Sequence, residues 1–297
     1  MPEENPLVSV LMTAYNREQY IREAIESVLS STYTNFELII VDDCSSDNTL
    51  LIAREYANRD SRLSVYSNPK NLGDYNNRNK AAGYVKGKYI KFVDSDDIIY
   101  PHSLSVFVTA MEMFSEAGVG IMSSANQDEN PYPYLLQPNE AYHYHFYKMG
   151  IFDTGPTALI FRTDRFKEIG GFSGKRFVGD TEINMKLAAK WPVVKIASSL
   201  VYWRRHEGQE IIEGTKSTGY LELHLPMYLE AFSKAECPLS PEERERILSY
   251  YRKISAKEIL KVALIKKKPA KAMSLYKSLK LELKDMFNAV MKGGKKY

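Results

Sequence analysis

Cysteine is scarce in this chain of 297 residues: Cys44 and Cys237 are the only two, and they lie far apart in the sequence. They form no CxxC pair and no Cys/His cluster, so the sequence contains neither a disulfide framework nor the ligand spacing of a zinc site. No apolar run approaches the roughly 18 residues that a membrane-spanning helix needs. The opening residues, MPEENP, are acidic where a signal peptide is basic and then apolar. These absences predict a soluble, cytoplasmic protein.

Neither sign of charge dominates the whole chain, which has 40 Lys and Arg against 37 Asp and Glu. The balance hides an asymmetry, because residues 252–297 hold 14 Lys and Arg against 3 Asp and Glu, while the rest of the chain is acidic. The body and the tail are therefore expected to contact different partners. Nucleic acid is not expected among them, since the body is acidic and carries no recognition motif.

Short apolar runs alternate with amphipathic stretches through the first hundred residues. The predicted strands are 7–12, 36–41, 63–66 and 89–93. The predicted helices are one capped by Asn16, with apolar positions from Ile21 to Leu29, and two near 47–58 and 75–85. This alternation predicts an α/β fold with a mainly parallel sheet flanked by helices, and such folds bind ligands beyond the carboxyl ends of the strands.

The second half of the chain has a weaker pattern. Strands are predicted at 119–122, 158–161 and 193–196, with helices from Pro101 and at about 180–190. Residues 126–150 are rich in Tyr, His, Pro and Asn without a clear period, which predicts a long loop or insertion. Beyond residue 218 the sequence is helical to its end.

Polar residues collect where the predicted strands end: Thr13–Asn16, Asp42–Asp43 and Asp94–Asp97. Turns and helix caps use the same residue types, and Asp97 is expected to cap the helix that follows. One cap explains one carboxylate, whereas a divalent cation bound with a phosphate explains three carboxylates in four residues. The turn 68–73 leads into a helix with Arg78, and its backbone N–H groups and this cation suit a diphosphate.

In order along the chain, Val8–Asn16, Phe36–Asp43, Asn71–Gly73 and Asp94–Asp97 closely resemble the motifs of the family 2 glycosyltransferases of the GT-A fold. These are inverting enzymes that use nucleotide sugars. The resemblance implies that Tyr15 stacks on the nucleobase, usually uracil, and that Asp42 accepts a hydrogen bond from it. The residues that it places at the donor are Thr13, Tyr15, Asp42, Asp43, Gly73, Arg78, Asp94, Ser95 and Asp96.

The same resemblance implies a divalent metal, Mn²⁺ or Mg²⁺, on Asp96. The segment Trp203–His206 is similar to the family's Tyr-Arg-x-His motif, in which the histidine completes the metal or the diphosphate site, and this makes His206 the candidate for a second metal ligand. Gly170–Phe172 and Val178–Asp180 resemble the segment before the acceptor helix, where an acidic doublet supplies the catalytic base. Here the doublet's first position is Gly179, so only Asp180 carries over, with Asp153 and Glu182 as the next candidates.

The resemblance also divides the chain. It implies a GT-A domain over residues 1–218, with a nucleotide-binding part at 7–101 and an acceptor part at 102–218, and a basic helical region at 219–297. The Gln-x-x-Arg-Trp motif of processive synthases is absent, which implies transfer of one sugar to a glycan or lipid-linked acceptor in surface polysaccharide synthesis.

The apolar row of the basic tail allows three outcomes. The row comprises Ala272, Leu275, Tyr276, Leu279, Leu283, Met286, Phe287 and Val290. It can pack against the preceding helix, form a homodimer contact, or lie on an anionic membrane as a peripheral attachment at the inner face. Internal or dimer contact is the first expectation, with a membrane-facing lysine surface as a secondary role.

Two other functions remain compatible with the sequence. A sugar nucleotidyltransferase has a related sheet, but its glycine-rich signature after the first strand is missing. A catalytically silent scaffold that binds nucleotide sugar or membrane is the other alternative. The released product distinguishes these functions. A glycosyltransferase releases a nucleoside diphosphate, a sugar nucleotidyltransferase releases pyrophosphate, and a silent scaffold releases no product.

Overall fold

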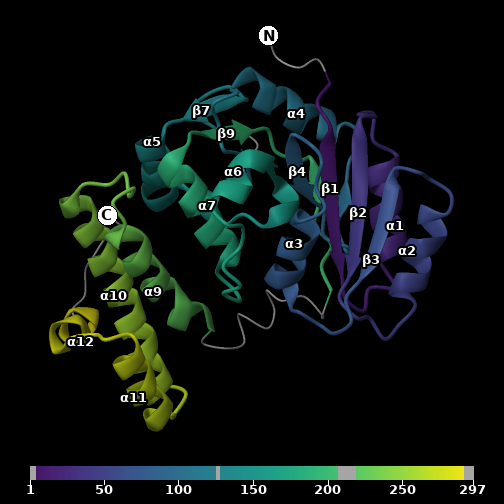
Figure 1. Cartoon of the computed structure of the whole chain (residues 1–297). Coiled ribbons are helices and arrows are strands. Elements are labelled where there is room, and N and C mark those ends of the chain that lie inside the picture. The colour runs from purple at the N-terminus through teal and green to yellow at the C-terminus, as the bar shows by residue number, and fades with distance from the viewer. Residues whose placement is uncertain (1–4, 125–127, 207–218, 291–297) are drawn as a thin grey trace. The chain divides into compact units, whose positions relative to one another are not determined.

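The computed structural model describes residues 5–124, 128–206 and 219–290 (Figure 1). For residues 219–221 it describes the backbone only. Its described residues divide into two compact units. One unit comprises residues 5–141 and 150–206, and the other comprises 142–149 and 219–290. Within the described residues, no helix combines the length and the apolar character needed to cross a bilayer.

An eight-stranded sheet forms the centre of the first unit, in the order β3-β2-β1-β4-β8-β6-β9-β7. The strands are β1 Val8–Ala14, β2 Phe36–Asp42, β3 Leu63–Ser67, β4 Tyr89–Phe92, β6 Val119–Met122, β7 Tyr134–Leu136, β8 Leu159–Arg162 and β9 Val193–Ile196. From β3 to β4 all pairs are parallel, and β6 and β9 are parallel too, whereas β8 runs antiparallel to β4 and β6. A short ribbon pairs β5 Ile98–Ile99 with β10 Val201–Tyr202.

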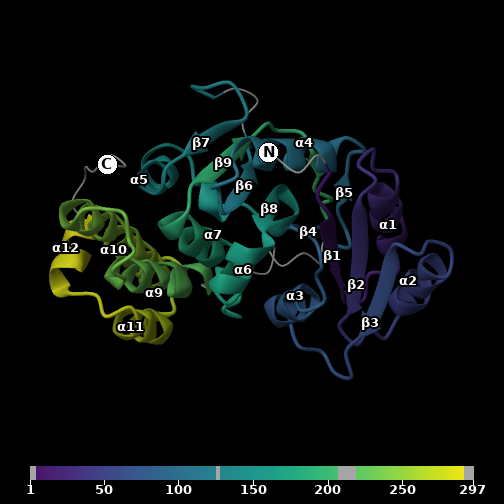
Figure 2. The same cartoon turned by 45° about the horizontal axis from the view of Figure 1, so that its top comes forward.

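Helices cover both faces of this sheet, which confirms the predicted α/β class. They are α1 Ile21–Leu29, α2 Thr49–Ala57, α3 Asp74–Ala82, α4 Ser103–Met113, α6 Thr163–Glu168 and α7 Gly179–Lys190, with 3₁₀ turns η2 Ile151–Asp153 and η3 Pro156–Ala158. Apolar residues of α1, α2 and α4 form one core with alternate residues of β1 and β2. Helices α3, α6 and α7 lie on the other face (Figure 2). Phe92, Phe161, Phe166 and Phe172 form an aromatic cluster there.

The second unit is helical. It contains η1 Tyr144–Lys148, α9 Gly219–Ser233, α10 Pro241–Leu264, α11 Pro269–Ser278 and α12 Leu283–Val290. Ser240 begins α10 with a capping box, since its hydroxyl accepts from the N–H of Glu243 and its own N–H donates to the Glu243 carboxylate. Arg244 donates to the carbonyls of Phe232, Cys237 and Leu239, which ties the α9–α10 connection to α10.

Two local predictions were wrong. Asn16 does not cap α1, because the helix begins at Ile21 and Asn16 has a positive φ of 52° in the preceding turn. The long loop or insertion predicted at 126–150 has regular structure in its described part, residues 128–150, which include β7, α5 Pro138–His143 and η1. The aromatic run there is largely buried, and Phe146 contacts Tyr228, Phe232 and Tyr251 of the second unit.

The apolar row of the tail divides between two environments. Ala272, Leu275 and Leu279 are buried, as internal contact requires. Leu283, Phe287 and Val290 are 80%, 67% and 70% exposed. Internal contact therefore accounts for the first half of the row and leaves the second half uncovered by the described residues.

Candidate active site

The carboxyl ends of β1, β2 and β4 meet at one edge of the sheet, as predicted. Ala14 at the end of β1 lies opposite Asp42 at the end of β2, and the N–H of Asp43 donates to the carbonyl of Ala14 over 2.8 Å. Leu11 lies opposite Phe92, so Asp94 follows β4 at the same edge. Parallel pairing thus gathers the polar segments behind these three strands.

Asp42 is buried and only half satisfied. Its Oδ2 accepts from the N–H of Ser45 at 3.1 Å and the hydroxyl of Ser67 at 3.4 Å. Among the described residues its buried Oδ1 has no hydrogen-bond partner. An unpaired buried carboxylate oxygen is costly, so this atom is suited to a donor on a ligand. Thr13 is buried in β1 opposite Val41, the residue before Asp42, and the exposed Tyr15 follows the strand.

Asp43 binds its own chain. Its carboxylate accepts from the amide of Asn68 at 2.6 Å and from the N–H groups of Leu72 and Gly73 at 2.9 Å each. Gly73 has a φ of 82°, a value that glycine adopts without strain, and it is the N-cap residue of α3. These N–H groups therefore hold the turn, where the sequence had assigned them to a diphosphate.

Arg78 on α3 joins several of the predicted acids. Its guanidinium lies 2.8 Å from Asp94 Oδ1 and 3.0 Å from Asp74 Oδ1. Burial disfavours the charged guanidinium, but attraction from Asp74, Asp94 and Asp180 outweighs this and holds the pKa of Arg78 well above its usual value. The arginine is therefore charged at all relevant pH values, and Asp94 and Asp180 share its field.

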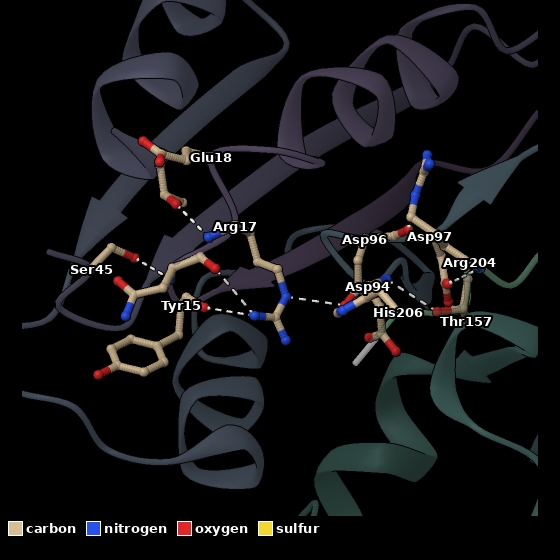
Figure 3. Close-up of polar contacts among 12 residues, drawn as sticks. Tyr15, Arg17, Glu18, Ser45, Asp94, Asp96, Asp97, Thr157, Arg204 and His206 are labelled. Atoms are coloured by element: carbon tan, nitrogen blue, oxygen red, sulfur yellow. Dashed lines mark hydrogen bonds and ion pairs between the residues drawn. The ribbon is translucent and has the colours of Figure 1, made fainter. Parts of the chain in front are cut away.

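Asp96 receives two nitrogen donors on one oxygen (Figure 3). Arg17 Nε and His206 Nε2 each lie 3.0 Å from Asp96 Oδ2. The structure thus brings together the two residues predicted to hold a metal, which are 110 positions apart. Arg17 also donates to the carbonyls of Tyr15 and Asn16, so it links the base-side turn to the acidic cluster.

Tyr20 and Arg204 fix the position of His206. The imidazole stacks on the Tyr20 ring with 4.6 Å between centroids, and the Arg204 guanidinium lies 5.3 Å from the same ring. The backbone N–H of Arg204 donates to Asp97 Oδ1, and its guanidinium Nε donates to the carbonyl of Asp96. The segment 203–206 is therefore fastened to the acidic cluster at three points.

Asp97 does not cap α4, whose N-cap is His102, so that prediction was wrong. Burial, followed by repulsion from Asp94 and Asp96, raises the pKa of Asp97 to about 7. Beneath the cluster, Lys91 of β4 donates from Nζ to the carbonyls of Thr157 and Phe92, and burial lowers its pKa to about 7. The Thr157 hydroxyl in turn accepts from the N–H of Asp94 at 3.1 Å, and Ser95 is buried between the acids.

Asp180 is the second residue of α7, on the side of the sheet that carries α3. A Cβ on Gly179 would lie 2.5 Å from the Tyr75 ring of α3, so the contact between these helices leaves no room for a larger residue at this position. Asn79 of α3 exchanges two hydrogen bonds with the backbone of Phe172, at 2.7 and 2.9 Å. These contacts pack the beginning of α7 and the segment before it against α3, the helix that carries Arg78.

The two alternative acids have other contacts. Glu182 is buried and interacts with Ser173, with Lys175 at 3.0 Å and with Lys186 at 3.4 Å. Asp153 accepts from the Thr181 hydroxyl at 2.9 Å. Asp180 is therefore the acid of α7 that the Arg78 field reaches, whereas Glu182 is engaged in an ion-pair cluster.

Asp96 and His206 are the residues that fit a divalent cation. Carboxylate oxygen and imidazole nitrogen are ligands that Mn²⁺ accepts, and both atoms already converge on one point. The described residues contain no group of three or more His, Cys, Asp and Glu side chains that could hold a metal by themselves. A cation bound here would thus need oxygens from a ligand such as a diphosphate.

A sequence model of the family described as glycosyl transferase family 2 matches residues 9–170, more than half of the chain. The chain is a member of glycosyltransferase family 2. This confirms the predicted family, and the fold comparison below confirms the GT-A architecture.

Two of the relatives of this chain carry the names of bacterial glycosyltransferases. It is 42% identical over 105 residues to E. coli WfgD, named a UDP-Glc:α-D-GlcNAc-diphosphoundecaprenol β-1,3-glucosyltransferase, covering 35% of this chain and 41% of WfgD. It is 42% identical over 97 residues to B. subtilis TuaG, a putative teichuronic acid biosynthesis glycosyltransferase, covering 33% of this chain and 38% of TuaG. The chain thus spans about two fifths of the length of these relatives.

Solved structures share the fold. S. aureus TarS 1–349 in complex with UDP-GlcNAc superposes with a TM-score of 0.65 at 21% identity, covering 95% of this chain and 79% of that one. The mannosyltransferase PcManGT of Pyrobaculum calidifontis, solved with GDP-Man and Mn²⁺, gives 0.61 at 15% identity, with coverages of 97% and 86%. Likeness at this identity establishes the architecture, which is a GT-A fold.

Sequence reasoning missed several residues around the acidic cluster of this glycosyltransferase. Arg17 stands directly after the quoted Val8–Asn16 motif and received no role. Lys91 interrupts an apolar strand, which was a usable signal for a buried charge with a partner. Thr157 gave no signal, because only the β4–β8 pairing brings it to Asp94.

Proposed function

We propose that this protein is an inverting glycosyltransferase that moves one sugar from a nucleotide sugar, UDP-linked, to a hydroxyl of a glycan or lipid-linked acceptor. The observation that carries the proposal is the placement of Asp94 and Asp180 in the field of one buried arginine, Arg78. Asp94 belongs to the donor-side acidic cluster and Asp180 begins the helix of the acceptor half. A sugar held beside Arg78 lies within reach of both.

The donor binds at the carboxyl edge of the sheet. Asp42 Oδ1 accepts the imide N–H of uracil, which supplies the missing partner of this buried oxygen, and the exposed Tyr15 ring stacks on the base. Asp43 keeps the 68–73 turn in place through its contacts with Asn68, Leu72 and Gly73. Arg78 faces the diphosphate or the sugar, where its fixed positive charge favours the anionic donor.

Asp180 takes the proton from the attacking acceptor hydroxyl. In a single displacement the hydroxyl attacks the anomeric carbon on the face opposite the leaving nucleoside diphosphate, so the configuration inverts. General base catalysis of this kind contributes typically 10²–10⁴ in rate. The positive charge of the buried Arg78 attracts the Asp180 carboxylate, so the acceptor-side acid and the donor-side acids share one cation.

Asp96 and His206 hold a divalent metal, Mn²⁺ or Mg²⁺. A metal at this place supplies Lewis-acid stabilisation of the charge that grows on the leaving diphosphate. Tyr20 and Arg204 keep His206 oriented toward Asp96, so this half of the ligand set is preformed. The segment 207–218, which the sequence suggested as a closing loop, lies outside the described residues.

The acceptor is a lipid-linked glycan at the inner face of the membrane, in synthesis of a surface polysaccharide. WfgD is named for transfer to GlcNAc-diphosphoundecaprenol, and TuaG for teichuronic acid synthesis, which supports this class of acceptor. The GT-A part spans residues 1–218 and the basic helical region 219–297. Contact with the membrane is assigned to this second region.

The experiment compares Asp180→Asn with Glu182→Gln in a transfer assay that uses UDP-glucose or UDP-GlcNAc, Mn²⁺ and a synthetic GlcNAc-diphospholipid. Asp180→Asn should reduce turnover by at least about 10²-fold with donor affinity nearly unchanged. Glu182→Gln should retain turnover in the protein that remains folded. Full turnover of Asp180→Asn places the base elsewhere, while release of pyrophosphate, or of no product with any donor, refutes glycosyl transfer.

A further inference from the structure

Helix α12 turns its large apolar side chains outward. Leu283, Phe287 and Val290 are exposed, whereas Asp285 and Ala289 are buried and Met286 is half-buried. At 100° per residue, the three exposed side chains fall within an arc of about 60° on the helix surface. We call these three residues the apolar stripe. A helix that buries its small and acidic residues and exposes its large apolar ones is the reverse of an ordinary core-facing helix.

Basic residues surround the apolar stripe in sequence and in the same helical unit. Between residues 264 and 290 there are seven lysines and two acids. All seven lysines are exposed, while Asp285 is buried and Glu282 pairs with Lys284 at 2.8 Å. The exposed surface of this segment is therefore strongly positive.

A second exposed apolar pair ends α10. Leu264 and Ile265 are 73% and 72% exposed, and Lys266, Lys267 and Lys268 follow them directly. Met273 of α11 is also more than half exposed. Apolar side chains alternate with lysines through the whole segment, so the combination does not depend on α12 alone.

We propose that the helical unit docks on an anionic lipid surface, with the apolar stripe inserted at the interface and the lysines on the lipid headgroups. Apolar side chains beside lysines are the chemistry that binds the boundary between headgroups and acyl chains. The charge argues against a second copy as the occupant, because a symmetric contact would bring the lysines of the two copies together. The inference deepens the proposed function, since it names the surface that presents a lipid-linked acceptor.

The test measures sedimentation of the full chain with vesicles of phosphatidylglycerol and phosphatidylcholine, and with vesicles of phosphatidylcholine alone. The wild-type chain should bind the anionic vesicles and lose binding as salt rises. The variant Leu283→Gln/Phe287→Gln/Val290→Gln should partition at least about tenfold less, because burial of each side chain contributes a factor of several. These positions are exposed, so the variant should keep the wild-type melting temperature.

A charge variant and a matched control complete the design. Lys266→Gln/Lys267→Gln/Lys268→Gln should lower partitioning by roughly fivefold per lysine that reaches the surface. The control Leu51→Gln/Met113→Gln removes two apolar residues, 58% and 60% exposed, from the first unit and should leave binding unchanged. Both results support docking through the helical unit.

Three results would overturn the proposal. One is a wild-type chain that does not bind anionic vesicles, and another is binding that the stripe and lysine variants leave intact. The third is a dimer that the stripe variant dissociates without any vesicle binding, which assigns the stripe to a second copy. Transfer to an acceptor in detergent solution, without vesicles, should be normal in all variants, so loss of docking and absence of transferase activity are distinguished.

Discussion

Removal of Arg17 should strengthen metal binding in the absence of nucleotide. Arg17 Nε lies 3.0 Å from Asp96 Oδ2, the oxygen that also faces His206. A divalent cation that uses this oxygen must displace the guanidinium. In Arg17→Ala this competitor is absent, and Asp96 remains paired with His206 alone among the contacts described above.

The size of the effect follows from the burial of the pair. The Arg17 and Asp96 side chains are 27% and 14% exposed, so the pair lies between the exposed and fully buried classes. Exposed pairs contribute about 0–1 kcal/mol and breaking a buried one costs about 3–5 kcal/mol. An intermediate value of about 1.4 kcal/mol corresponds to roughly tenfold tighter Mn²⁺ binding in the variant.

Free Mn²⁺ can be counted by electron paramagnetic resonance during a titration without donor. Arg17→Lys keeps the positive charge and should give a smaller gain, while Arg22→Ala, whose partners are Glu55 and Tyr56, should give none. Weaker Mn²⁺ binding by Arg17→Ala would refute the reasoning, because it would make Arg17 a support of the site instead of a competitor.

Two further predictions concern Lys91, which lies beneath the acidic cluster, and Gly179, the first residue of α7. The Lys91 pKa is lowered from 10.5 to about 7 by burial, so the unfolded state binds more protons between these values and the wild-type chain gains stability as pH rises through them. Lys91→Met cannot gain this stability, which amounts to up to about 1.4 kcal/mol per pH unit. Urea unfolding of both proteins across that pH range should therefore show the unfolding free energy of the wild-type chain rising relative to that of the variant. Gly179→Ala places a methyl group 2.5 Å from the Tyr75 ring and should cost about 1–3 kcal/mol in unfolding free energy. Adding Tyr75→Leu should restore most of that stability in thermal denaturation, and no restoration would mean that the ring contact is not the cause.

The first hundred residues were predictable because their signals are local. Strands β1, β2 and β4 are compact apolar runs, and α1 repeats its apolar residues at helical spacing, so the elements were placed within a few residues. The segment 126–150 failed for the opposite reason. Its aromatic residues bury against helices about a hundred positions later, as Phe146 does against Tyr251, and this partner is invisible in a short window.

Some residues of the candidate site could likewise be predicted from the local sequence, and others could not. Asp42, Asp94 and Asp96 stand directly behind strands, where the sequence itself marks the edge of the sheet. That His206 faces Asp96 required a motif resemblance, since 110 residues separate them. Arg17 and Thr157 reach the acidic cluster through contacts that only the folded chain defines.

The antiparallel pairing of β8 with β4 bears on how the chain is made. The parallel strands from β3 to β4 are complete once residue 92 has been synthesised, but β8 ends only at residue 162. At about 5–20 residues per second, β4 remains an open edge for roughly 4–14 seconds. An apolar open edge invites pairing with other nascent chains, and a lysine in such a strand opposes it. Until Thr157 has been made, Lys91 lacks the carbonyl that its Nζ contacts in the folded chain, so the residue beneath the acidic cluster is also the lysine of this open edge.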